Sequence, residues 1–525
     1  MLKQLTLFLF LLLNLAFNVA AEQLDCDSGE LITQEFENGA QWDLCWESRI
    51  RENLVLSDIY YTPPEGEASL VLSEARLSQL HVAYDDSDVT YNDITQYGLG
   101  GGYLVDLTPE DCPIGELLIS QTRPAACAWL ATGDDNFRMR NRASSAHSLN
   151  LFSVSQVGSY AYIISWLFYD DGAIEPQIGA SGALQRSSSS LTLPFGRVLQ
   201  GDPDTLWLSH THNYYWHLDF DLGEHATDDV VAQSQFQFDK DGIRRQQSAL
   251  FTIEAALQID PQSATAWHIL DNPAAGEPVN KSRGYIIEPT RFGHRLVREE
   301  TEPYTEFDFF ITVAKDCERY ASQNARFNPD CKNHVLEYVD NESLVNQDLV
   351  VWHRVSFHHV PRSEDQRHMH SHWDGFLIEP TNIHTSSPGL NGQANQAPQL
   401  DPIDAQNHRR GKPVDWHAHA SDADNDALTF TATGLPSGIV LSTDGTFTGK
   451  ATEDGDFTVV VNVSDGIDSS ERTFDWTIAK TKKGSGAIGY WLLLLVSVVL
   501  MRHSPPRASW PTYPMGTWFS RTTTN

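Results

Sequence analysis

Apolar and polar positions alternate in short runs through the first three quarters of the chain. SYAYIISWLFYD (159–170) and DLVVWHRVSFHHV (348–360) are two of these runs, and Asp, Gly, Pro and Ser residues separate them at close intervals. A period of two residues is typical of a half-buried strand, and few stretches have the longer period of a helix. The pattern therefore predicts an all-β chain, with a large antiparallel β-sandwich over residues 22–390.

A second, smaller domain is expected after this region. The segment HTSSPGLNGQANQAPQ (384–399) is rich in Gly, Pro, Asn and Gln, as linkers are. Beyond it, DALTFTATGLPSGIVLSTDGTFTGKATEDGDFTVVVNVSDG alternates cleanly with a turn every several residues. This predicts a linker and a small Ig-like β-sandwich within residues 391–480. The opening NQAP and the closing VNVSDG resemble the Ig-like domains repeated on bacterial surface proteins.

The two ends of the chain carry apolar segments. Lys3, an apolar run and the small residues before Glu22 are typical of a secretory signal peptide over residues 1–21. Near the other end, residues 484–502 form a glycine-flanked apolar segment, followed by a tail over residues 503–525. A buried core helix is the alternative to a membrane anchor there. The segment also resembles the C-terminal sorting signals of Gram-negative exported proteins, so we expect a protein of the periplasm or cell surface of such a bacterium.

Charge and cysteine content add two constraints. The formal net charge of −34 excludes nucleic acid as a partner, because phosphate contacts need a basic surface, and it favours the approach of cations such as small amines. All six cysteines lie beyond the signal peptide, and an even count in an exported chain predicts disulfides. Sequential pairing is the simplest of about 15 connectivities. The sequential pairs are Cys26 with Cys45, Cys112 with Cys127, and Cys317 with Cys331.

The run LSHTHNYYWHLDFDLGE (208–224) holds two candidate ligand pairs, His210 with His212 and Asp219 with Asp221. Residues two apart in a strand point to the same side, so each pair can present two ligands together. Imidazoles suit copper or zinc, and carboxylates suit calcium. Two ligands do not complete a site, and two histidine clusters follow downstream. FHHV holds His358 and His359, whereas RHMHSHW holds three alternating histidines and is the stronger candidate on spacing alone.

Several segments, taken in order, resemble the copper-containing amine oxidases. They are NLVLSDIYY, YNDITQYGLG, VGSYAYIISWLFYDDGAIE, SHTHNYYWHLDFD, ERYASQNARFNPDCKNHVLEYVDNESLVNQDLVVWH and HHVPRSED, and together they span most of residues 42–388. The resemblance implies oxidation of a primary amine by O2 to an aldehyde, ammonia and hydrogen peroxide. It also implies bound copper, a topaquinone made from a tyrosine, and a homodimer.

The resemblance assigns the catalytic residues. Tyr160 in QVGSYAY is the expected topaquinone precursor, because amine oxidation needs an electrophilic carbonyl that no standard side chain provides. Asp93 in YNDITQYGLG matches the catalytic base, Tyr91 the gate of the amine channel, and Tyr84 the tyrosine that hydrogen-bonds the quinone oxygen. The family motif around the quinone is altered in this chain, where Gln156, Ser159 and Ala161 stand in place of Thr, Asn and an acid.

The resemblance also selects the metal ligands. Copper is expected on His210, His212 and His359, and the RHMHSHW cluster is expected to supply surface residues or a weak extra site. A structural calcium ion is expected on Asp219, the Phe220 carbonyl, Asp221, Asp348 and the Leu349 carbonyl. Asp340 and Glu342 partly match a second peripheral site. The alternative function is that of a catalytically inactive, amine oxidase-like binding protein on the cell surface, held to the membrane by its C-terminal segment.

Overall fold

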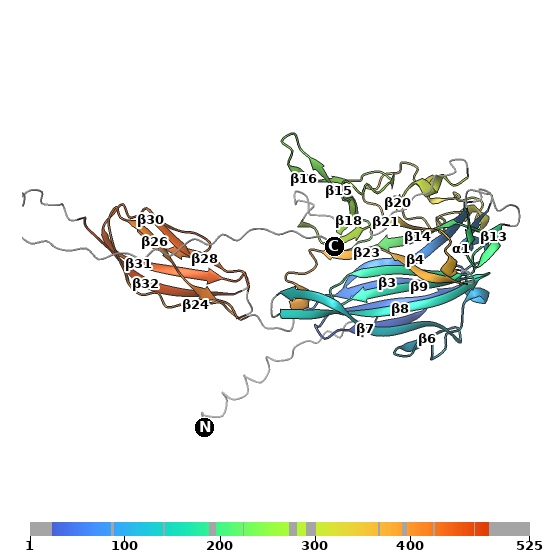
Figure 1. The fold of residues 1–525 in the computed structure, drawn as a ribbon, viewed down its shortest axis with the longest axis horizontal. Coiled ribbons are helices and arrows are strands. Elements are labelled where there is room, and N and C mark those ends of the chain that lie inside the picture. Colours follow the sequence, from blue (N-terminus) through green and yellow to red (C-terminus); the bar gives the residue numbers. More distant parts are fainter. Residues whose placement is uncertain are drawn as a thin grey trace, which may run out of the picture. The chain divides into compact units, whose positions relative to one another are not determined.

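The computed structural model describes residues 24–481 except 86–88, 140–141, 188–195, 224, 272–280, 290–300, 366–367, 391–395, 424–425 and 467. The expected signal peptide (1–21), C-terminal anchor (484–502) and tail (503–525) lie outside these residues. The chain divides into two compact units, the first ending at Ala394 and the second beginning at Asn395. Strands dominate both units, so the predicted all-β fold class is confirmed (Figure 1).

The first unit contains two large antiparallel sheets. The first sheet has the spatial order β1 (Glu30–Glu35), β2 (Gln41–Arg49), β3 (Asn53–Thr62), β4 (Ser69–Tyr84), β14 (His210–Phe220), β21 (Leu349–His359), β20 (Phe309–Val313) and β17 (Ala255–Leu257), and β5 (Thr90–Asn92) pairs with β4. The second has the order β16 (Arg244–Leu250), β15 (Asp229–Phe238), β18 (Ala266–Asp271), β19 (Gly284–Glu288), β23 (Leu377–Thr381), β10 (Ile174–Gly182), β9 (Tyr160–Tyr169), β8 (Arg142–Val157), β7 (Arg123–Met139) and β6 (Glu116–Ser120), with β22 (Met369–Gly375) beside β10.

Short elements complete this unit. A small sheet has the order β11 (Arg186–Ser187), β13 (Asp202–Leu208) and β12 (Gly196–Leu199). The α-helices of the described residues are single turns, α1 (Asp93–Gln96) and α2 (Val335–Tyr338). The described 3₁₀ turns are η1 (Gly101–Tyr103), η3 (Pro303–Glu306), η4 (Asn324–Arg326), η5 (Ser363–Asp365) and η6 (Pro388–Leu390).

The two large sheets enclose one apolar core, and strand β14 runs through it. Trp216 of β14 meets Trp166 of β9 edge to face, with ring centres 5.1 Å apart. The even-numbered residues of β14 therefore face the second sheet, because side chains alternate along a strand. The odd-numbered residues face the opposite way, where the His217 ring packs on Trp352 with centres 4.6 Å apart. His210 and His212 thus face the core between the sheets.

The second unit is a small sandwich, as the alternation of its sequence predicts. One sheet has the order β25 (Gln406–Arg409), β32 (Ser469–Ala479), β31 (Gly455–Ser464) and β28 (Thr429–Thr433), and another the order β26 (Pro413–His417), β30 (Thr446–Lys450) and β29 (Ile439–Leu441). A short pair joins β24 (Gln399–Leu400) to β27 (Ala420–Ser421). Phe447, Phe474 and Trp476 fill its core.

Disulfides link the cysteines in sequential order, as the simplest connectivity predicts. The pairs are Cys26 with Cys45, Cys112 with Cys127, and Cys317 with Cys331. A search of the described residues finds no helix with both the length and the apolar character needed to cross a membrane.

Candidate active site and metal sites

A cavity of about 590 Å³ opens where the two sheets meet, and all four residues proposed as catalytic line it. Tyr84 ends strand β4, Tyr91 lies in β5, Asp93 begins α1 and Tyr160 begins β9. Tyr84, Tyr91 and Asp93 come from consecutive elements beside the first sheet, whereas Tyr160 comes from the second sheet. The fold thus brings together residues from two distant parts of the sequence.

Tyr160 stands immediately after the tight turn that joins β8 to β9. Val157 pairs with Tyr160 across this hairpin, and Gly158 in the turn has a φ of 58°, which favours glycine. The hydroxyl oxygens of Tyr160 and Tyr84 lie 3.1 Å apart and share a hydrogen bond. Burial raises the pKa of Tyr160 to about 12, and the hydrogen bond from Tyr84 opposes the shift. The ring is therefore held as a neutral phenol against the cavity wall.

Asp93 is a buried carboxyl group with a strong donor. Only 5% of the residue is exposed, and its Oδ2 accepts a 2.7 Å hydrogen bond from the Tyr162 hydroxyl. Burial raises the pKa of Asp93 to about 6, while the hydrogen bond from Tyr162 lowers it. A carboxyl group with such a pKa is ionised at neutral pH and still basic enough to accept a proton.

Tyr91 and Tyr84 meet edge to face, with ring centres 6.0 Å apart. Tyr84 is also the cross-strand partner of His210, and these two rings have centres 5.0 Å apart. Tyr84 therefore contacts both the wall of the cavity and the histidines behind it.

The histidines proposed as copper ligands gather directly behind Tyr160. His210 pairs with His359 across β14 and β21, and their ring centres are 5.2 Å apart. The His210 and His212 rings have centres 4.8 Å apart, and the Tyr160 ring lies 5.9 Å from the first and 5.8 Å from the second. Burial lowers the pKa of His210 to about 3 and also lowers those of His212 and His359. All three imidazoles are thus neutral at physiological pH, the form that binds metals.

Two of these rings have one nitrogen fixed by a polar partner. Nδ1 of His212 lies 2.7 Å from the Tyr214 hydroxyl, and Nε2 of His359 lies 3.2 Å from Oδ2 of Asp365 in η5. The other nitrogens, Nε2 of His212 and Nδ1 of His359, are buried and have no hydrogen-bond partner, and neither has Nε2 of His210. A buried ring nitrogen without a hydrogen-bond partner destabilises the folded protein. Three imidazoles with free inward nitrogens, two of them oriented by hydrogen bonds to their other nitrogen, form a donor set that fits a copper ion.

The histidine nitrogens nevertheless stand farther apart than in a closed coordination sphere. In the described part of the chain, one group of His, Cys, Asp or Glu side chains has all its ligand atoms within 4.8 Å of one another: Glu254, Asp340 and Glu342. The three histidines do not meet this limit, so metal binding on His210, His212 and His359 would require their rings to rotate.

Two residues at this site were not singled out from the sequence. Tyr214 lies two positions beyond His212, so strand alternation places it on the same face and could have indicated it. Asp365 follows His359 by six positions, and only the chain reversal at η5 brings its carboxylate back to the ring. The RHMHSHW histidines were expected at the surface or at a weak extra site; His368 and His370 are exposed, whereas the side chain of His372 is only 11% exposed, so the surface alternative does not hold for it.

Asp219, the first of the residues proposed to bind calcium, lies on the opposite face of β14. Asp219 pairs with Val350, and this register places Asp348 nearby. Asp219 and Asp348 line a cavity of about 570 Å³. Burial and the charge of Asp348 raise the pKa of Asp219 to about 7, although Arg76 opposes the shift. Oδ1 of Asp219 is buried and has no hydrogen-bond partner. A hard cation fits this oxygen-rich place.

The remaining residues of this set surround the same strand ends. Phe220 is the last residue of β14, and Leu349 is the first of β21. Asp221 lies just beyond β14, so strand alternation does not determine the direction of its side chain. Burial raises the pKa of Asp221 and that of Asp348, and the charge of Asp221 adds to the shift of Asp348.

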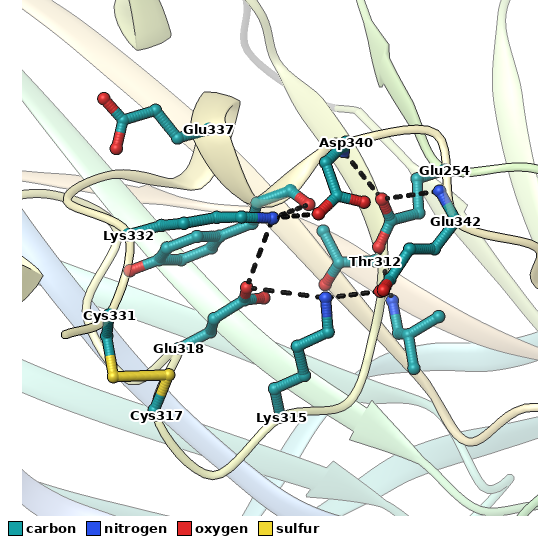
Figure 2. Close-up of polar contacts among 12 residues, drawn as sticks. Glu254, Thr312, Lys315, Cys317, Glu318, Cys331, Lys332, Glu337, Asp340 and Glu342 are labelled. Carbon is teal, nitrogen blue, oxygen red and sulfur yellow. Dashed lines mark hydrogen bonds and ion pairs between the residues drawn. A yellow bond between two sulfur atoms is a disulfide. The ribbon is translucent and has the colours of Figure 1, made fainter.

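The second peripheral group, which includes Asp340 and Glu342, already holds two internal cations (Figure 2). The ammonium group of Lys332 pairs with Asp340, and that of Lys315 pairs with Glu342. Both ammonium groups also lie within 4 Å of Glu318, at 3.9 and 3.8 Å respectively. Glu254 accepts hydrogen bonds from the backbone amides of Asp340 and Val313, at 2.7 and 3.1 Å. Lysine side chains thus pair with two of the three carboxylates of this group.

The first unit is thus an all-β sandwich in which tyrosines and a buried carboxyl group line one cavity and buried histidines pack behind Tyr160. Residues 133–398 match the family described as copper amine oxidase, enzyme domain, and this stretch includes Tyr160 and all three proposed copper ligands. The chain belongs to the copper amine oxidase family. Residues 397–479 match an Ig domain family, which confirms the second predicted domain type.

Curated relatives and solved structures agree with this assignment. The primary amine oxidase of Pisum sativum is 24% identical over 397 residues, which cover 67% of this chain and 58% of the relative. That of Klebsiella aerogenes is 24% identical, with 68% and 53% covered. The crystal structure of Aspergillus nidulans amine oxidase has a TM-score of 0.58 at 22% identity, covering 70% of this chain and 55% of that one. This chain thus spans between half and two thirds of the length of each of these three proteins.

Proposed function

We propose that this protein is a copper-dependent primary-amine oxidase that forms topaquinone from Tyr160. The observation that carries the proposal is the position of the Tyr160 ring. Its ring packs against those of His210 and His212, and its hydroxyl shares a hydrogen bond with that of Tyr84, at a cavity that Asp93 also lines. The products would be an aldehyde, ammonia and hydrogen peroxide.

Asp93 is the proposed base. Its carboxylate lines the same cavity as Tyr160, so a bound amine can lie between them. Because its pKa is about 6, Asp93 is ionised at neutral pH and can accept a proton from the carbon beside the amine nitrogen. Tyr162 holds the carboxylate in place, and Tyr91 on the wall of the cavity is the proposed gate for the amine.

His210, His212 and His359 are the proposed copper ligands. Bound copper, together with O2, would supply the oxidising chemistry that converts the Tyr160 phenol into a quinone. The chain's own contribution is to keep the imidazoles neutral, with Tyr214 and Asp365 orienting the outer nitrogens of two rings. Tyr84 would hold the oxygen of the Tyr160 ring through the bond described above.

Further proposals concern calcium, export and assembly. A structural calcium ion would bind Asp219, Asp221, Asp348 and the carbonyls of Phe220 and Leu349, and the raised pKa of Asp219 supports this. The disulfides support export to the periplasm or cell surface of a Gram-negative bacterium. A homodimer and a membrane anchor at residues 484–502 remain proposals from the sequence.

Reconstitution of the apo-protein with Cu(II) in air tests the proposed function. We expect a visible quinone band that reacts with phenylhydrazine and is absent from Tyr160→Phe. Turnover of a primary amine should then release hydrogen peroxide.

The rival function, a catalytically inactive binding protein, is favoured by the exposed Ser159 beside Tyr160, where the family has an amide. Copper bound without a quinone band would contradict the oxidase and support this rival.

A further inference from the structure

His372 reaches the proposed copper site from the opposite sheet. Strand β22 pairs with β10, and in this register His372 lies opposite Ala180, which in turn lies opposite Tyr162 in β9. His210, His212 and His359 all belong to the first sheet, on β14 and β21. The second sheet, which carries Tyr160, therefore also carries a histidine that faces the same space.

The four imidazoles form a closed ring of neighbours. The centre of the His372 ring lies 5.3 Å from that of His212 and 6.5 Å from that of His359. His210 completes the ring, since its centre lies 4.8 Å from His212 and 5.2 Å from His359. His372 thus occupies a position across the site from His210, and it contacts the same two neighbours.

A carboxyl group orients the imidazole of His372, as one often orients the imidazole of a metal-binding histidine. Its Nδ1 lies 2.7 Å from Oδ2 of Asp374, a side chain with no exposed surface. A hydrogen bond between Nδ1 and this carboxyl group leaves Nε2 as the ring nitrogen that is available to a metal ion. That Nε2 atom is buried and has no hydrogen-bond partner. The Phe357 ring stacks on the imidazole with centres 3.8 Å apart and prevents it from turning away.

We propose that His372 is a fourth imidazole ligand of the copper site, with Asp374 as the residue that orients it. This inference rests on the proposed function, because it takes copper as the ion held by His210, His212 and His359. Four nitrogen donors suit the tetragonal geometry that Cu(II) prefers. A carboxylate hydrogen-bonded to the outer nitrogen is the arrangement that strengthens a histidine ligand.

The test counts nitrogen ligands on Cu(II) in the full-length protein. Pulsed electron paramagnetic resonance of the copper-loaded wild type should detect four coordinated imidazoles, and His372→Gln should retain three. Glutamine keeps an N–H donor for Asp374 and removes the aromatic nitrogen. Competition with a chelator of known affinity should show that His372→Gln binds Cu(II) at least about tenfold more weakly. His370→Gln, an exposed histidine of the same strand, should match the wild type in both measurements.

The outcomes separate this inference from the proposed function. Three imidazoles in the wild type, or equal affinity in His372→Gln, would overturn the role of His372 while leaving the oxidase intact if the quinone forms. Four imidazoles without any quinone band would support His372 and contradict the oxidase. If His372→Gln does not fold, the nitrogen count in the wild type alone decides the matter.

Discussion

The hydroxyl of Tyr162 donates a 2.7 Å hydrogen bond to Asp93, 69 positions earlier in the chain. Tyr162 belongs to a strand of the second sheet, whereas Asp93 follows an edge strand of the first. The bond stabilises the carboxylate and so opposes the effect of burial, which raises the pKa of Asp93 to about 6. This pair therefore sets the pH at which the proposed base is ionised.

Replacing Tyr162 by Phe should raise the pKa of Asp93 further, because the carboxylate loses a hydrogen-bond donor. The ionised form is the proposed base, so activity is lost as the pH falls through this pKa. The acidic limb of kcat/KM should therefore move to higher pH, by about one unit. A pH–rate profile measures the shift. Tyr97→Phe, which alters another tyrosine of the same cavity, should leave the limb in place, and an unmoved limb in Tyr162→Phe would contradict the pairing.

Replacing Asp93 by Asn should separate proton transfer from quinone formation. An amide cannot accept the proton, so amine turnover should fall by roughly 100-fold or more. The phenylhydrazine-reactive band should persist, since Asp93 is not among the proposed copper ligands. Steady-state kinetics and the absorbance of the same sample provide the two measurements. Turnover close to that of the wild type would exclude Asp93 as the base.

Replacing Tyr84 by Phe should slow quinone formation. The substitution removes the 3.1 Å hydrogen bond to Tyr160, which raises the pKa of the Tyr160 phenol further and loosens its ring. The visible band should then appear several-fold more slowly after Cu(II) is added in air. Stopped-flow or manual absorbance records give the rate. Tyr97→Phe again serves as the control, and equal rates in Tyr84→Phe and the wild type would show that this bond does not hold the ring.

Calcium should stabilise the first unit through Asp219. An ion that binds only the folded state adds about 2–3 kcal/mol at a hundredfold excess over its Kd, which corresponds to a Tm increase of a few degrees. Asp219→Asn should lose this response to calcium. Asp340→Asn should keep it, because Lys332 already neutralises Asp340. Differential scanning calorimetry with calcium and with a chelator measures the effect, and a calcium response in Asp219→Asn would place the ion elsewhere.

Lys315 and Lys332, shown in Figure 2, should contribute most to the stability of the fold above neutral pH. Burial raises the pKa of Glu318 to about 7, and Lys315 and Lys332 oppose this shift. With a folded pKa above its ordinary value, Glu318 favours folding at low pH, and this contribution is lost as the pH rises through about 7. Lys332→Met should raise that pKa further. The variant should therefore lose stability mainly above pH 7, by roughly 1–2 kcal/mol, since Lys332 is partly exposed.

Thermal unfolding at mildly acidic and mildly alkaline pH tests this difference. Lys240→Met, in an exposed turn, provides a matched loss of one positive charge. The control should show the same Tm change at both values of pH. A loss of Tm in Lys332→Met that does not depend on pH would show that Glu318 is not the group that the lysine compensates.

The sequence predicted those features of the site that follow from local geometry or from motifs. Alternation places His210 and His212 on one face of a strand, and β14 has this arrangement. The same rule separates Asp219 from them, because it lies an odd number of positions along the strand from each histidine. The resemblance to the amine oxidases supplied Tyr160, Asp93 and Tyr84, which spacing alone does not connect.

The features that the sequence did not reveal depend on long-range register. Spacing pointed to the RHMHSHW cluster as a metal candidate, but only the pairing of β22 with β10 in the other sheet shows that His372, rather than its two neighbours, faces His212 and His359. Lys332 meets Glu318 because the Cys317–Cys331 disulfide closes the loop between them. Such contacts depend on which strands and loops become neighbours, and that is a property of the whole fold rather than of any segment.

Strand β14 is hydrogen-bonded along both edges, by β4 and β21, and all of its residues except Asp219 are buried. Its amides should exchange with solvent only when the unit unfolds globally. The imidazoles that it carries are consequently in place before any metal ion arrives. If copper binds these imidazoles, its uptake would depend on access rather than on folding, and the cavity lined by Tyr84 and Tyr160 is the proposed passage. The width of that passage would set the rate at which a newly folded protein matures.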